Sequence, residues 1–216
     1  MIEADAINKR VEKFRSQLNG YQTPFEIAEV ITKCLKPWNV KINVRRSSEV
    51  PITELSIGGS YDDSKKRKNI ELDLYFAPRQ KKFAWYDYNR EATVFLLKQV
   101  LQHELIHEYQ MACRPDDSKG YALFYDIVSK DKSKQEEIDY LSELDEIEAY
   151  AHDIAMEIVY HYPDENPYQV LKKITRKKYL VSWKIYASAF RGCKDWSMVR
   201  HRLLAKVYGW IPYVKV

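Results

Sequence analysis

The spacing of apolar residues predicts two helices at the start of the chain. Apolar positions recur at helical intervals between residues 2 and 18, and Asn19-Gly20 then provides a stop. Thr23-Pro24 opens a second helix, because the backbone N–H at the first helical position has no partner within the helix and proline, which lacks this N–H, is tolerated there. This second helix is expected to end before Pro37, since the residue before a proline disfavours the helical backbone.

From Asn39 onward the pattern changes to an alternation of apolar and polar residues, which is typical of strands. The three apolar runs are 40–44, the surroundings of Leu55 and Ile57, and 70–76. They predict a small antiparallel sheet of about three strands, with the segment from Gly58 to Lys68 as a hairpin connection. The basic run Lys65-Lys66-Arg67-Lys68 in this connection is expected to be a solvated turn.

Beyond Arg90 the pattern is helical. The predicted helices are 91–112, 119–129, 134–161, 166–174, 178–191 and 195–208, separated by prolines and glycines. The chain is therefore expected to be an α+β protein with N-terminal helices, a small sheet and a mainly helical C-terminal half. Residues 1–160 are expected to form one domain, with 161–216 as a helical extension packed on it, although the whole chain has the size of a single domain.

Composition excludes several classes of protein. With 216 residues, 45% of them hydrophobic and 31% charged, the chain has the make-up of a soluble globular protein. Its 35 Lys and Arg stand against 31 Asp and Glu, so a net charge of +4 does not by itself indicate nucleic-acid binding. The sequence contains neither of the glycine-rich phosphate-binding motifs, GxGxxG and GxxxxGK[ST].

The cysteines and the N-terminal residues indicate the cellular compartment to expect. Cys34, Cys113 and Cys193 are far apart and form no CxxC pair, which argues against both a disulfide framework and a cysteine-based zinc site. The first fourteen residues mix acids and bases and lack the apolar core of a signal peptide. No uninterrupted apolar run reaches membrane-spanning length, so a cytoplasmic protein without membrane contact is expected.

The predicted helix that begins near Arg90 contains the pattern HExxH, from His103 to His107. Two imidazoles four residues apart project from one face of a helix and can chelate a single metal ion, with Glu104 beside a metal-bound water. The helix also carries many apolar residues, which predicts that it is buried. Two unpartnered histidines would be costly there, so a metal site is favoured over a pair of surface histidines.

A catalytic zinc site needs a third protein ligand, and the acidic segment 142–155 is the richest source. On a helix, Glu148 lies within the apolar arc of this segment, whereas Glu146 points away from it. A carboxylate on a buried face needs a partner such as a metal ion. Glu148 is therefore favoured as the third ligand, with Glu146 and His152 as alternatives.

These residues resemble the gluzincin metallopeptidases, particularly their compact intracellular members. In that group the helix after HExxH carries the third ligand in a pattern like E-x-x-A-[DN]-x-x-A, and Glu148, Ala151 and Ala155 fit it. The resemblance implies a zincin-like fold with one Zn²⁺ held by His103, His107 and Glu148. His152 stands where the group usually has an acid or amide that orients a ligating histidine.

A second resemblance comes from the segment before the motif. The runs 56–61 and 70–72 are similar to the strand pair that precedes HExxH in compact gluzincins and in SprT-like proteases. In such enzymes a strand at the edge of the sheet lies over the metal and pairs with an extended substrate. SprT-like proteins generally supply a third histidine soon after the motif, but here none follows His107 until His152.

The expected function is that of a zinc-dependent endopeptidase acting on a protein or peptide. Glu104 would serve as the general base for a metal-activated water. Tyr150 or His152 would stabilise the oxyanion or orient a metal ligand, with Tyr109 and Tyr121 as further candidates.

Two other readings of the sequence remain open. One is a SprT-like protease for DNA-associated proteins, with phosphate contacts from Lys65–Lys68 and from the C-terminal basic residues Arg200, His201, Arg202 and Lys206. The other is a metal-stabilised interaction protein without catalysis.

Overall fold

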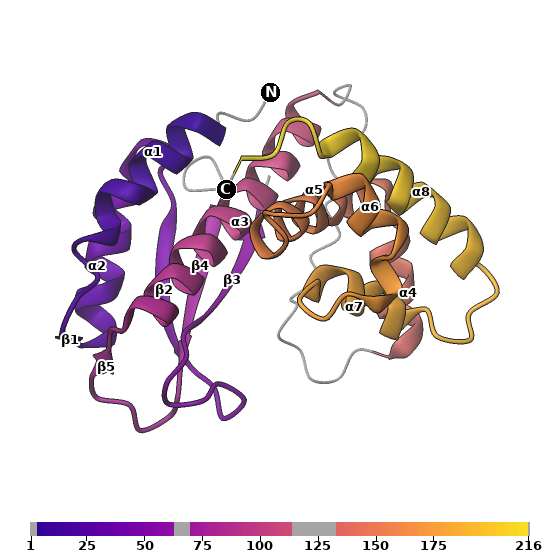
Figure 1. Ribbon diagram of the computed structural model, residues 1–216. Coiled ribbons are helices and arrows are strands. Elements are labelled where there is room, and N and C mark those ends of the chain that lie inside the picture. The colour runs from indigo at the N-terminus through magenta and orange to yellow at the C-terminus, as the bar shows by residue number, and fades with distance from the viewer. Residues whose placement is uncertain (1–3, 63–69, 114–132, 216) are drawn as a thin grey trace. The chain divides into compact units, whose positions relative to one another are not determined.

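The computed structural model describes residues 4–62, 70–113 and 133–215 (Figure 1). Packing divides the chain into two compact units, Met1–Ala122 and Leu123–Val216. The mixed α+β class predicted from the sequence is confirmed. Among the described helices, none combines the length and the apolar character needed to cross a membrane.

The first unit begins with helices α1 (Ala4–Arg15) and α2 (Pro24–Leu35), followed by a short 3₁₀ turn, η1 (Lys36–Trp38). Thr23 caps α2: its Oγ1 accepts from the Glu26 backbone N–H at 3.2 Å, and the Glu26 carboxylate accepts from the Thr23 N–H at 2.6 Å. Such a reciprocal cap satisfies two backbone donors and holds the start of the helix in place.

Three strands form the main sheet: β2 (Lys41–Arg46), β3 (Ser56–Tyr61) and β4 (Ile70–Phe76). Their order is β2-β4-β3, so β4 is the central strand and β3 lies at an edge. β3 pairs antiparallel with β4 as the predicted hairpin requires, but β2 pairs parallel with β4. The prediction of a wholly antiparallel sheet is therefore wrong for β2, because alternation of residues is the same in parallel and antiparallel strands and carries no direction.

A second, two-stranded sheet pairs β1 (Tyr21–Gln22) with β5 (Phe83–Ala84) in antiparallel register. Each strand is only two residues long, too short to show an alternating pattern. β5 ends three residues before α3 (Asp87–Ala112), the longest helix of the described chain. This small sheet ties the start of α3 to the connection between α1 and α2.

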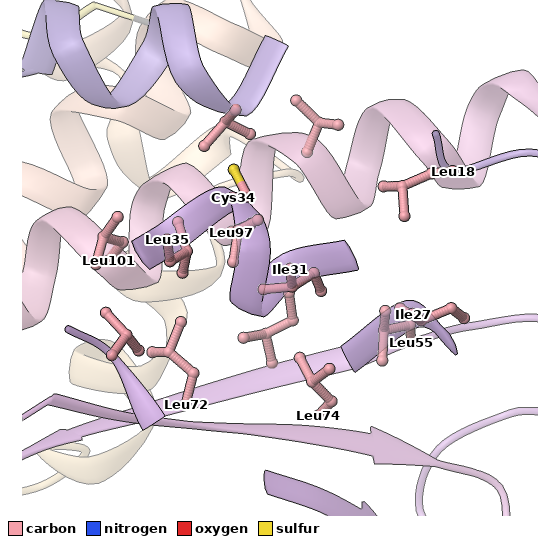
Figure 2. Packing of buried hydrophobic residues seen from close by; sticks show 14 of the residues in the cluster. Leu18, Ile27, Ile31, Cys34, Leu35, Leu55, Leu72, Leu74, Leu97 and Leu101 are labelled. Carbon is pink, nitrogen blue, oxygen red and sulfur yellow. The ribbon is translucent and has the colours of Figure 1, made fainter. Parts of the chain in front are cut away.

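The core of this unit lies between one face of the main sheet and its helices. Alternate residues of β4, Ile70, Leu72, Leu74 and Phe76, are buried, and α2 packs against β2 while α3 packs against β3. Figure 2 shows Leu72 and Leu74 below the side chains of α2 and α3 in this layer. The opposite face of β4 is polar, with Asp73 accepting from Asn43 at 2.8 Å. α3 is therefore held rigidly on the sheet along its buried length.

The second unit is helical. Its elements are α4 (Lys134–Ser142), α5 (Leu144–His161), α6 (Pro167–Lys172), the 3₁₀ turn η3 (Ile174–Arg176), α7 (Val181–Ala189) and α8 (Trp196–Trp210). α5 is central and packs against α4, α6, α7 and α8. The single helix predicted over 134–161 is broken at Glu143, whose extended backbone ends α4 and starts α5. No proline or glycine marks this break, so the rules for helix ends do not predict it.

Some predictions stay open. The predicted helix over 119–129 and the basic turn Lys65–Lys68 lie outside the described residues. The predicted domain boundary after residue 160 coincides with neither compact unit, and the division into domains stays a prediction. Within the second unit, α5 packs closely with the helices that follow residue 160.

Candidate metal centre

The HExxH residues lie near the C-terminal end of α3, where His103, Glu104 and Ile106 are buried and Leu105 and His107 are half-buried. His103 and Glu104 are 9% and 4% exposed, and the rings of His103 and His107 stand edge to face with centroids 4.9 Å apart. This is the geometry that a spacing of four residues on one helical face produces. Both imidazoles therefore present their nitrogens to a common region.

Gln110 is a neighbour of His107 that sequence reasoning missed. Its Oε1 lies 3.0 Å from Nδ1 of His107, one turn further along α3. With the proton on Nδ1, His107 donates to Gln110 and keeps the lone pair of Nε2 for a metal ion. The three-residue spacing after His107 is the only sequence signal for this contact.

Glu104 lies against the edge strand β3. A β-carbon added at Gly59 would stand 2.5 Å from Glu104 Oε1 and 2.8 Å from Glu104 Cγ. Only glycine allows the strand to approach the carboxylate so closely. Gly58-Gly59 is predicted from the sequence to belong to a hairpin connection, but both residues lie within β3. Gly59 allows this strand to pass next to the general-base candidate.

His103, His107 and Glu146 form a group that could hold a metal ion. Each offers one ligand atom, and these atoms all lie within 4.8 Å of one another. Two imidazole nitrogens and one carboxylate oxygen make up a donor set used by catalytic zinc sites, which keep a fourth position for water. The residues present therefore fit a zinc ion chemically.

The acid in this group is Glu146, the alternative ligand, and not Glu148, the one favoured from the sequence. Glu148 forms an ion pair with Lys206 of α8. His152, on the same side of α5, stacks edge to face with Trp210 of α8 at 5.0 Å between ring centroids. α8 therefore occupies the side of α5 to which Glu148 points.

Glu146 belongs to a second buried side of α5 that the apolar pattern does not reveal. At about 100° per residue, Glu146 shares a face with Asp153 and Glu157, and all three are buried. Ser182 at the start of α7 donates its N–H and its hydroxyl to Glu157, at 3.1 Å and 2.9 Å to Oε1. The apolar arc alone predicts one buried side of α5, but α7 packs against the acidic side and buries it as well.

Two of the residues expected to orient a ligand or stabilise an oxyanion, His152 and Tyr150, make contacts within the second unit. His152 Nδ1 stands 3.8 Å from Asp153 Oδ1, which is too long for a hydrogen bond. The Tyr150 ring packs edge to face on Tyr186 of α7, with centroids 5.3 Å apart. Tyr109 is exposed and Tyr121 lies outside the described residues, so an oxyanion role for any of them stays a prediction.

Tyr186 is a further neighbour of the acidic side of α5 that the sequence did not single out for the site. It is fully buried, and burial raises its pKa well above the ordinary value, with a further contribution from the negative charges of Glu146 and Asp153. The phenol therefore stays protonated and neutral beside these carboxylates at physiological pH.

Comparisons with known proteins found no relative of this chain. No family model matches the chain, and no curated protein or solved structure matches it.

Proposed function

We propose that this protein is a zinc-dependent peptidase whose metal ligands are His103, His107 and Glu146. The observation that carries the proposal is the grouping of these three side chains around a common region, with Glu104 between the two histidines in sequence. This is the donor set of a hydrolytic zinc site, and a purely structural zinc site is usually closed by a fourth protein ligand.

A bound zinc ion would lower the pKa of its water ligand to about 7 and polarise a carbonyl group. Glu104 is the residue of this chain suited to accept the proton of the attacking water and to pass it to the leaving amine. Its carboxylate is buried and packed against Gly59, so its position relative to His103 and His107 is restrained. A restrained base avoids the cost of reorganisation during the reaction.

The position of β3 supports a polypeptide substrate. β3 bonds to β4 along one edge, and none of the described strands pairs with its other edge. An open strand edge can bind an extended peptide through backbone hydrogen bonds. Because Gly59 of this strand also contacts Glu104, a peptide added there would lie close to the general base.

The Glu104→Gln variant tests the proposal. We expect it to bind about one zinc ion per chain, as the wild type does, and to lose about 10²–10⁴-fold in the rate of peptide cleavage. Zinc content and cleavage of an unfolded protein substrate are the measurements. A variant as active as the wild type would rule out the assigned role, and zinc-dependent stability without cleavage by the wild type would favour the non-catalytic interpretation.

A second candidate, a peptidase for DNA-associated proteins, is favoured by the distribution of charge. Residues 161–216 contain twelve Lys and Arg against three Asp and Glu, while residues 123–160 contain three against eleven. The small net charge of the whole chain hides this segregation. Several cations of the C-terminal stretch are exposed and form no ion pair with any described residue, namely Lys172, Lys173, Arg176, Lys178, Lys184, Lys194, Arg200 and Arg202.

Binding of duplex DNA at increasing salt tests this candidate. A protein that neutralises several phosphates loses affinity steeply between low and moderate salt. We expect Arg200→Glu/Arg202→Glu to weaken binding and flatten the salt dependence. Arg79→Glu/Lys81→Glu, an equal charge change at two exposed residues of the first unit, is the control. No binding at low salt would dismiss the candidate.

A further inference from the structure

The first unit contains a cleft of about 780 Å³ that the metal centre does not use. Its walls come from three elements, α1, η1 and the C-terminal part of α3. The lining residues are Ala6, Lys9, Arg10, Lys13, Pro37, Trp38, Leu105, Glu108, Tyr109 and Ala112. The volume falls within the range of binding sites for ligands.

The cleft lies on the opposite side of α3 from the HExxH histidines. Leu105, Glu108, Tyr109 and Ala112 follow one another at intervals of three, one and three residues, which places them on one face of the helix. At about 100° per residue, His103 and His107 fall roughly half a turn away from that face. The cleft is therefore a separate site that shares only the helix with the metal centre.

One wall of the cleft is cationic. Lys9 and Lys13, one turn apart on α1, are exposed and form no ion pair with any residue that the structure describes. Arg10 lies between them and donates to the backbone carbonyls of Cys34 and Lys33 at the end of α2, which holds its guanidinium in place. Glu108 is the one acid among the lining residues, so the lining carries an excess of positive charge.

The rest of the lining is apolar and aromatic. Trp38 and Leu105 are half-buried and pack against the core, which gives the cleft a fixed apolar surface. Tyr109, another lining residue, is 55% exposed. Aromatic rings beside cations suit a ligand that combines an apolar or aromatic group with negative charge.

We propose that this cleft binds an acidic peptide segment that carries an aromatic side chain. The ring would pack on Trp38 and Tyr109, and carboxylates on either side of it would meet Lys9 and Lys13. A peptide is favoured over a small molecule because most lining residues are exposed, so the walls do not enclose a ligand as a small-molecule site does. The proposal does not depend on peptide hydrolysis at the metal centre.

Fluorescence anisotropy with the full chain tests this proposal. The probe is a labelled peptide with one tryptophan between runs of aspartate and glutamate, and the protein carries Glu104→Gln so that cleavage cannot interfere. We expect saturable binding that weakens with added salt. Comparison peptides replace the acids with lysines or the tryptophan with alanine, and both are expected to bind at least tenfold more weakly.

Variants of the lining decide where the probe binds. We expect Lys9→Glu/Lys13→Glu and Tyr109→Ala each to weaken binding at least fivefold, since these side chains are exposed and their loss leaves the core intact. Arg79→Glu/Lys81→Glu, with the same charge change on an exposed loop, should leave binding unchanged. No binding at low salt, equal binding of the lysine peptide, or equal losses in the lining and control variants would overturn the proposal.

Discussion

Gly59 of β3 and Glu104 of α3 are in contact across the sheet–helix interface. A β-carbon at Gly59 would stand 2.5 Å from Glu104 Oε1 and 2.7 Å from Val100 Cγ1, closer than side-chain carbons come in proteins. The neighbouring Gly58 points to the other face of the sheet, where an added β-carbon would lie 3.3 Å from Tyr75. Of these two adjacent glycines, only Gly59 affects the position of the general-base candidate.

Gly59→Ala is therefore expected to reduce peptide cleavage by at least tenfold, because the new methyl group must displace the Glu104 carboxylate. Overpacking against Val100 should also cost about 1–3 kcal/mol of stability. Gly58→Ala is the matched control and should keep activity within about twofold. Cleavage rates and thermal unfolding of both variants are the measurements, and equal activity of the two would contradict the assigned role of Glu104.

Glu146→Gln is expected to weaken zinc binding at least tenfold, because an amide oxygen is a poorer ligand than a carboxylate. Glu148→Gln should leave zinc affinity unchanged, since Glu148 is paired with Lys206. Isothermal titration with zinc measures both. A loss of affinity in the Glu148 variant alone would restore the ligand predicted from the sequence.

Removal of zinc gives a second readout of the same site. A ligand that binds the folded state stabilises it, so a chelator should lower the melting temperature of the wild type, and added zinc should restore it. The melting temperature of Glu146→Gln should respond little to either treatment. If the chelator changes neither protein, then no metal contributes to stability.

Ser182→Ala should destabilise the second unit by about 1–2 kcal/mol. The Ser182 hydroxyl donates to the buried Glu157 carboxylate at 2.9 Å, and α7 has no side-chain cap from its own N-cap residue. Ser188→Ala, at an exposed position of the same helix, is the control and should change stability by less than about 0.5 kcal/mol. Urea unfolding of both variants measures the difference.

Cys34 predicts a pH dependence of stability. Burial raises the pKa of its thiol to about 12 from an ordinary value of 9.0. Below about pH 9 the thiol is protonated in both states, so it contributes no pH dependence. Between about pH 9 and 12 the unfolded chain loses this proton and the folded chain keeps it, so stability should fall with rising pH by about 1.4 kcal/mol per unit.

The slope of unfolding free energy against pH in this range, compared with that of Cys34→Ala, isolates the thiol. The variant should be less stable at neutral pH because it leaves a small cavity, but its slope should be shallower. Equal slopes would show that the Cys34 thiol does not titrate differently in the two states.

Local patterns in the sequence were sufficient for part of the fold and part of the site. The α+β class, the strand 70–76 and the helix that carries His103, Glu104 and His107 follow from residue periodicity, which reflects which side of an element is buried. The spacing of the two histidines and their place on a buried helix are equally local. The charge segregation between 123–160 and 161–216 was also present in the sequence, but the total charge concealed it.

Periodicity does not show which elements pack against each face of a helix or strand. The parallel pairing of β2, the break at Glu143 and the contact of Gly59 with Glu104 each depend on residues far apart in the chain or on a backbone change that no glycine or proline marks. The different surroundings of Glu146 and Glu148 are of this kind. An isolated helix has one apolar arc, but α5 is packed by α7 on its acidic side and by α8 on the side of Glu148. Only the tertiary structure pairs Lys206 with Glu148 and shows that Glu146 is buried, because burial of a polar side chain is decided by what packs against it.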